Sequence, residues 1–223
     1  MPASTDGFAA RIVTVETFPV GMLACNCTIV ADEASGEAIV IDGGDDVDEI
    51  AGRLDAHGWR ARYLVHTHAH IDHIGALGPL RERTGAAGLL HPADLPLYAT
   101  LAQQALWLGQ LEPPQVVALD GALADGEVLD AGAVRLRCVH TPGHTPGSTS
   151  FALDDGGRTE LFTGDTLFSG SVGRWDLGGT SLADIVQSIR TKLLVHDDDS
   201  VVVPGHGPFT TIGTERRTNP YLS

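Results

Sequence analysis

The sequence has 223 residues, a length that one domain with a substantial core can accommodate, and we expect a single domain over residues 1–223. Hydrophobic residues make up 43% of the chain and charged residues 19%, values that exclude a disordered or fibrous protein. Fourteen basic residues against 29 acidic ones give a formal net charge of −15. This acidity argues against a nucleic-acid partner and against an anionic membrane surface, because binding to either depends on Lys and Arg.

The N-terminal part of the chain predicts strands followed by a helix. Segments rich in β-branched residues and bounded by turn residues indicate a strand meander. These segments are 11–18, 25–33 and 36–44. Apolar residues then recur at helical spacing over 46–58, which predicts a helix whose start Asp45 and Asp46 cap.

The remainder of the chain repeats this alternation of strands and helices. Further strands are expected within 60–68, 115–120, 127–141, 148–165 and 200–207, with a hairpin turn at DDGG, residues 154–157. Helices are expected at 73–85, 94–111 and 181–195, the first of them with a break or kink at Pro79. Two blocks of strands, each followed by helices, predict an α/β fold in which two sheets pack face to face with helices outside.

The cysteines and the N-terminal segment indicate the cellular compartment in which the protein resides. Cys25, Cys27 and Cys138 cannot all pair, and no segment has the apolar core of a signal peptide or of a membrane helix. We therefore expect a cytoplasmic protein with reduced thiols. On a strand, Cys25 and Cys27 would share one face, where they are either small buried hydrophobes, the preferred interpretation, or a redox pair.

The densest group of potential metal ligands is THAHIDH, residues 67–73, at the end of a predicted strand. In an extended segment His68 and His70 point the same way, so that two imidazoles can meet one cation. If the chain then turns into a helix, Asp72 and His73 point toward a second position a few ångströms away. The segment therefore predicts donors for two neighbouring cations.

Three more candidate ligands follow apolar strands in Gly- or Pro-containing loops: His144 in TPGHTPGS, Asp165 in LFTGDTLF and His206 in VVVPGHGP. Together with the first group they make seven donors, too many for one tetrahedral zinc and suited to two ions that share a carboxylate. Asp42, in IVIDGG, is either a turn residue or a side chain that orients a ligating histidine. Of the other histidines, we expect His57 and His196 on the surface, and His66, His91 and His140 either in the core or beside the ligands as supporting residues.

The motifs THAHIDH, TPGHTPGS, TGDTLF and PGHGP, in this order and spacing, resemble the metallo-β-lactamase superfamily, in particular its glyoxalase II-like hydrolases. The resemblance implies the four-layer αββα sandwich of that family. It implies a first metal held by His68, His70 and His144, and a second by Asp72, His73 and His206, with Asp165 bridging both. Zinc is the expected metal, and iron or manganese suits the same donors.

By this resemblance the expected reaction is hydrolysis of a thioester, such as an acyl or hydroxyacyl conjugate of a low-molecular-weight thiol. A metal-bridging hydroxide would attack the carbonyl, and Asp72 would orient or deprotonate the water. Arg174, in SVGRWDLGG, occupies the basic position of a glutathione-contacting loop, where it contacts the substrate or forms a loop salt bridge. Asp176 replaces the expected aromatic hydroxyl, and the basic tail is missing, which indicates a short glyoxalase II-like subgroup.

Several alternatives remain open at this point. The GRWD stretch also resembles persulfide dioxygenases, which would hold one iron with His68, His144 and Asp165. A lactonase, a β-lactamase, a nuclease of the same superfamily and a non-catalytic binding module are the other possibilities. The expected partner is a small molecule, and the sequence leaves the oligomeric state open.

Overall fold

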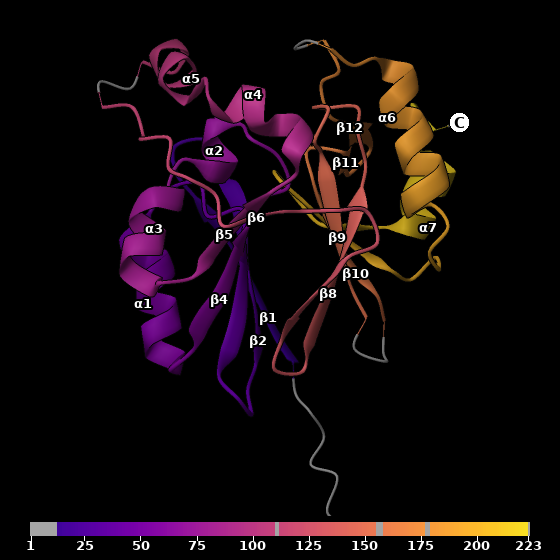
Figure 1. Ribbon diagram of the computed structural model, residues 1–223. Coiled ribbons are helices and arrows are strands. Elements are labelled where there is room, and N and C mark those ends of the chain that lie inside the picture. The colour runs from indigo at the N-terminus through magenta and orange to yellow at the C-terminus, as the bar shows by residue number, and fades with distance from the viewer. Residues whose placement is uncertain (1–12, 110–111, 155–157, 177–178, 223) are drawn as a thin grey trace, which may run out of the picture.

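The computed structural model describes residues 13–109, 112–154, 158–176 and 179–222 (Figure 1). Two six-stranded sheets and a short hairpin contain the strands of this part of the chain. The first sheet has the order β1 (Val13–Val20), β2 (Cys25–Asp32), β3 (Glu37–Ile41), β4 (Arg60–Val65), β5 (Ala87–Leu90), β6 (Gly121–Ala122). The second has the order β14 (Thr210–Thr211), β13 (Val201–Pro204), β10 (Glu160–Gly164), β9 (Thr149–Leu153), β8 (Val134–His140), β7 (Val128–Ala131). The hairpin pairs β11 (Leu167–Phe168) with β12 (Ser171–Val172).

Helices cover the outer faces of both sheets. Those beside the first sheet are α1 (Val47–His57), α2 (Ile71–Ile74), α3 (Leu77–Thr84), α4 (Leu95–Tyr98) and α5 (Leu101–Trp107). Those beside the second sheet are α6 (Leu182–Ser188) and α7 (Ile212–Thr218). Figure 1 shows the two sheets face to face at the centre, with α1 and α3 on one side and α6 and α7 on the other. The αββα sandwich expected from the sequence is therefore confirmed.

Side-chain alternation along the strands explains these layers. In β2, Ile29 packs under the helices of the first sheet, whereas its neighbour Val30 packs between the sheets. In β10, Leu161 packs under α6, and Phe162 packs between the sheets. Successive side chains of a strand point to opposite faces, so apolar residues at consecutive positions fill two separate cores. The central strands are therefore buried on both faces.

The structure corrects several expected elements. Residues 115–120 form no strand, and pairing with β5 begins only at β6. The helix expected at 73–85 is two helices that separate before Pro79, which sits in the first turn of α3, where its missing N–H breaks no helical bond. The helix expected at 94–111 is likewise divided into α4 and α5. Asp46 does not cap α1 with its side chain, because its carboxylate accepts the backbone N–H of Gly21 instead (2.8 Å).

Two further expectations concern the thiols and the membrane. All three cysteines are free and buried, and Cys25 and Cys27 lie in the same core, as expected for residues two apart on a strand. Burial raises the pKa of the Cys25 thiol to about 12, which opposes reactivity as a thiolate. In the described residues no helix has the length and apolar character to cross a membrane.

Candidate metal centre

The seven predicted ligands come from four loops that meet at one end of the sandwich. His68 and His70 follow β4 in extended backbone, and α2 begins directly after His70. The turn into α2 brings Asp72 and His73 around, as the sequence predicted. His144 follows β8, Asp165 follows β10, and His206 follows β13. Segments as distant as residues 68 and 206 are thereby brought together.

The first donor group consists of three imidazole nitrogens. Nδ1 of His70 lies 2.9 Å from Nε2 of His68 and 2.9 Å from Nε2 of His144. His144 Nδ1 faces the carbonyl oxygen of Arg174 (2.7 Å), which can only accept, so Nδ1 carries the proton and Nε2 presents a lone pair. His68 Nδ1 likewise faces the Thr67 hydroxyl (3.1 Å), whose own proton is donated to Asp42 (2.7 Å). Both Nε2 lone pairs therefore point at His70 Nδ1, which can donate to only one of them.

The second donor group consists of Asp72, His73 and His206, and lone pairs face one another in it as well. His73 Nδ1 donates to Asp42 (3.0 Å), and His206 Nδ1 donates to the carbonyl of Leu23 (3.1 Å), so that in the neutral form of each ring the Nε2 atom carries a lone pair. These nitrogens face carboxylates: His206 Nε2 lies 3.0 Å from Asp72 Oδ2, and His73 Nε2 lies 3.6 Å from the same oxygen. Lone pairs that face lone pairs repel one another unless a proton or a cation lies between them.

Asp165 lies between the two groups. Its Oδ2 is 3.6 Å from His144 Nε2, and its Oδ1 is 3.4 Å from His73 Nε2 and 3.7 Å from His206 Nε2. Asp165 Oδ1 and His73 Nε2 are buried and have no hydrogen-bond partner. Buried polar atoms in proteins are normally paired, so these two atoms fit donors to a cation. The donor set, five imidazoles and two carboxylates, suits a pair of borderline divalent ions.

Burial and charge determine the protonation of the donors. Burial, reinforced by neighbouring histidines, lowers the pKa of His70 to about 4 and that of His68 as well, so both imidazoles are neutral at pH 7. Burial also raises the pKa of Asp72, but His73 and His206 outweigh it and bring the pKa below its usual range. For His73, burial lowers the pKa, but surrounding groups, among them Asp42 and Asp165, outweigh burial and raise it. The same carboxylates that attract a proton to His73 would attract a cation.

Asp42, for which the sequence left two roles open, contacts the second donor group directly and the first through Thr67. Its carboxylate accepts the backbone N–H of Thr67 (2.7 Å), the hydroxyl of Thr67 and the ring N–H of His73. The residue is 2% exposed and adopts a positive φ of 54°. Asp42 therefore sets the ring tautomer of His73 directly and that of His68 through Thr67.

Arg174 contributes its backbone rather than its side chain. Its carbonyl oxygen accepts the ring N–H of His144, whereas its exposed guanidinium pairs with Asp176 at 3.0 and 3.2 Å. Of the two roles considered for Arg174, this geometry corresponds to the loop salt bridge.

Two buried residues that sequence reasoning missed hold the ligand loops together. Asp94 is 0% exposed and accepts hydrogen bonds from Ala69 N (3.1 Å), the Thr145 hydroxyl (2.8 Å) and Gly147 N (2.6 Å). It thus joins the loop of His68 and His70 to the loop of His144. Gln104 of α5 accepts from Ile71 N (2.9 Å) and donates to Ala69 O (3.2 Å). No local pattern in the sequence marks either residue as a support of the ligand loops, because the partners in those loops lie 25 to 53 positions away.

Comparison with known proteins identifies the family. The sequence pattern of the metallo-beta-lactamase superfamily matches residues 20–206. The chain belongs to this superfamily. Its members are generally metal-binding hydrolases, and the resemblance stated from the sequence is confirmed.

Three similar proteins illustrate the range of this family. An uncharacterized protein of Mycobacterium tuberculosis is 41% identical over 217 residues, covering 92% of this chain and 96% of that protein. Hydroxyacylglutathione hydrolase GloC of Haemophilus influenzae is 34% identical over 218 residues, covering 95% of this chain and 99% of that protein. The crystal structure of TTHA1623 in a di-iron-bound form aligns with a TM-score of 0.82 at 35% identity, covering 93% of this chain and 100% of that one. The chain is therefore similar to a glyoxalase II-like enzyme and to a protein that binds two irons.

Proposed function

We propose that the protein is a binuclear metallohydrolase that cleaves thioesters, namely acyl or hydroxyacyl conjugates of a low-molecular-weight thiol. The observation that carries this proposal is the pair of lone-pair donor groups on either side of Asp165. His68, His70 and His144 would hold one divalent ion, Asp72, His73 and His206 would hold the other, and Asp165 would contact both. Zinc is the metal that we propose, while iron, present in the di-iron form of TTHA1623, is compatible with the same donors.

The bound ions would polarise the substrate carbonyl and lower the pKa of a water molecule at the centre. The protein would hold the ligating imidazoles neutral and the ligating carboxylates ionised, the forms in which they bind a cation. Asp72 would orient or deprotonate the attacking water, because its carboxylate belongs to the second donor group, with Oδ2 3.0 Å from His206 Nε2.

A thioester also suits the lack of a general acid among the described residues of the centre. Burial raises the pKa of Asp94, but its oxygens are committed to Ala69, Thr145 and Gly147, and it is 0% exposed. Asp94 therefore cannot reach a leaving group. A thiol with a pKa of about 8.5 departs as the thiolate without protonation, whereas an amine does not.

The competing proposal is a mononuclear-iron persulfide dioxygenase that uses His68, His144 and Asp165. That enzyme would not require the second donor group, yet His73 Nε2, His206 Nε2 and Asp72 Oδ2 also converge. A small-molecule substrate remains our proposal, since the net charge of −15 opposes binding to nucleic acid.

Metal analysis combined with a thioester panel tests the proposal. We expect the wild-type protein to bind two divalent ions per chain and to hydrolyse acyl thioesters. The variant Asp165→Ala should bind fewer than two ions and should have no activity. One iron per chain, with oxygen consumed on a persulfide, would establish the dioxygenase instead. A protein that binds two ions but cleaves no thioester or lactone would be a binding module.

A further inference from the structure

A cavity of about 420 Å³ opens directly beside the second donor group. Asp72 and Ile71, at the start of α2, form part of its lining, so the cavity is continuous with the proposed metal centre. Its volume lies within the range of small-ligand sites. A group attached to a carbonyl at the centre can therefore extend into this space.

The walls of the cavity are largely apolar. Met22 and Leu23, in the turn between β1 and β2, form one side, and Leu108 and Pro114, beyond α5, form another. Met22 is 70% exposed and Leu23 is 44% exposed. Large apolar side chains grouped at an opening indicate contact with an apolar ligand more strongly than isolated exposed ones do.

The turn that carries Met22 and Leu23 is fixed to the metal centre. Gly21 N donates to Asp46 (2.8 Å), and the Leu23 carbonyl accepts the ring N–H of His206 (3.1 Å). Asn26 donates to the carbonyl of Pro204 (2.9 Å). The apolar wall is thus held at a defined place relative to His206, and a ligand that binds there does not need to order it.

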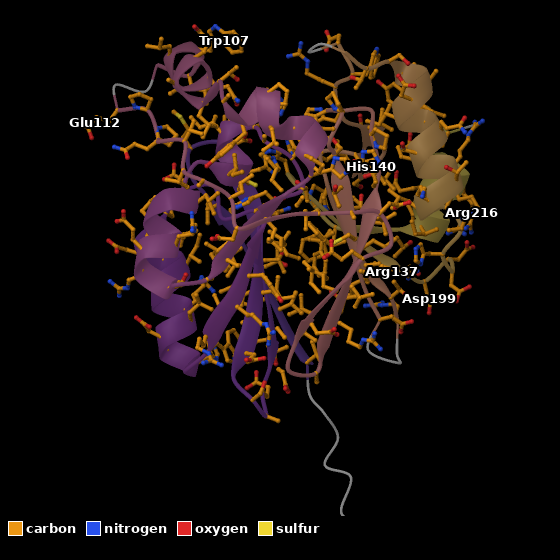
Figure 2. All side chains as sticks on the ribbon, viewed as in Figure 1. Trp107, Glu112, Arg137, His140, Asp199 and Arg216 are labelled. Carbon is orange, nitrogen blue, oxygen red and sulfur yellow. The ribbon has the colours of Figure 1, made fainter. Side chains whose placement is uncertain are left out.

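The charges at the cavity are all negative. Among the described residues that line it, the ionisable ones apart from Asp72 are Asp45 and Glu112, and none is Lys or Arg. Within the described part of the chain, neither carboxylate forms a salt bridge. The side chain of Asp45 packs against Gly21: a Cβ added to Gly21 would lie 2.9 Å from the Cβ of Asp45. Glu112 lies on the outer edge of the molecule, beyond α5 (Figure 2). Arg174, whose carbonyl contacts His144 of the first donor group, does not line the cavity, and its guanidinium is paired with Asp176.

We propose that this cavity receives an uncharged, apolar part of the substrate and that Asp45, with Glu112 at the rim, disfavours carboxylates there. The inference rests on the proposed thioesterase function and narrows its substrate class. The preferred thioesters are those whose group on this side, acyl or thiol, carries no anion. Glutathione, which has two carboxylates, is then a poor thiol portion if the thiol side occupies the cavity.

Binding of uncleavable thioethers tests the cavity independently of turnover. The probes are S-hexyl-N-acetylcysteamine, its S-(5-carboxypentyl) analogue and S-hexylglutathione, measured by titration calorimetry on metal-loaded and metal-free protein at low and high salt. We expect the neutral thioether to bind about five- to tenfold more tightly than at least one of the two carboxylate-bearing thioethers at low salt, with the difference shrinking as salt screens it. Discrimination against the carboxypentyl compound alone places the alkyl side in the cavity, and discrimination against the glutathione compound alone places the thiol side there.

The variant Asp45→Asn with Glu112→Gln should reduce this preference to less than about twofold, and Met22→Ala should weaken the neutral thioether severalfold. The matched control is Glu33→Gln. Glu33 is an exposed acid just beyond the end of β2 that is far from the cavity, and an eight-residue strand separates it from Met22 and Leu23 by about 26 Å. This substitution should leave the binding of all three probes unchanged. Equal binding of all three probes, or a preference that survives the double variant, would overturn the inference.

Hydrolysis of the corresponding hexanoyl thioesters separates this inference from the proposed function. Charge-selective binding without cleavage of any thioester would refute the thioesterase and retain the cavity assignment. Cleavage of neutral and carboxylate-bearing thioesters at equal kcat/KM would support the thioesterase and refute the cavity assignment.

Discussion

Replacing Gly205 with alanine should remove a cation from the proposed centre while leaving the fold intact. Gly205 directly follows β13, and its backbone is tied on both sides: its N–H donates to the Gly164 carbonyl (2.8 Å), and its carbonyl accepts from Asn26 N (2.7 Å). A Cβ at this position would lie 2.3 Å from Asp165 Oδ1 and 2.7 Å from His73 Cε1. The φ of Gly205 lies outside the left-handed region, so the perturbation is steric rather than conformational.

The size of the effect follows from these distances. Ordinary contact begins at 3.4 Å, so Asp165 Oδ1 must retreat by about 1 Å, or the tethered backbone must move. Metal–ligand distances tolerate only about 0.2 Å of variation. We therefore expect the affinity for the second cation to fall about 100-fold or more, with a comparable loss of kcat. Overpacking of this kind costs about 1–3 kcal/mol in the free energy of unfolding, which the fold can tolerate.

The assay is metal stoichiometry by mass spectrometry after dialysis at defined free zinc, together with thermal unfolding monitored by circular dichroism. Gly52→Ala is the matched control, because Gly52 lies within α1 with nothing within 4 Å of the added methyl group; it should retain both ions and gain about 0.5–1 kcal/mol. Two tightly bound ions and activity within twofold of wild type in Gly205→Ala would refute the assignment of Asp165 and His73 as ligands.

Three further predictions concern residues around the centre. Asp94→Asn places an amide against the N–H groups of Ala69 or Gly147, so we expect a loss of about 2 kcal/mol in chemical denaturation and a weaker first metal site; a variant with native stability and two tightly bound ions would contradict this. Arg174→Ala should leave metal content unchanged and KM within about twofold, because His144 contacts only the backbone of Arg174, whereas a tenfold rise in KM would show that the guanidinium grips the substrate. Burial raises the pKa of all three thiols, so native protein at pH 8 should react with no equivalents of a disulfide reagent and unfolded protein with three; fast modification of the native protein would revive the redox pair.

Features that depend on neighbouring residues were predictable from the sequence. The layers were predicted because two blocks of strands, each followed by helices, can be read along the chain. The opposite packing of Ile29 and Val30 is local in the same sense, since it depends only on the two-residue period of a strand. The change from extended backbone to helix after His70 is equally local, so the approach of His68 and His70, with Asp72 and His73 one turn later, could be derived. The motifs THAHIDH, TPGHTPGS, TGDTLF and PGHGP, in their order and spacing, then indicated the family.

Features that depend on contacts between distant segments were decided only by the tertiary structure. Asp46 was expected to cap α1, but its carboxylate binds Gly21 N, 25 positions away, because packing brings that donor within reach. Asp94 has no local signature, yet it joins two ligand loops. The carbonyl of Arg174 accepts the ring N–H of His144, 30 positions away, and the cavity beside Asp72 is assembled from segments near residues 22, 45, 72 and 112. Local backbone preferences determine strands, turns and the spacing of ligands, whereas the partner of a buried carboxylate and the shape of a cavity depend on which surfaces pack together, and that is a property of the whole chain.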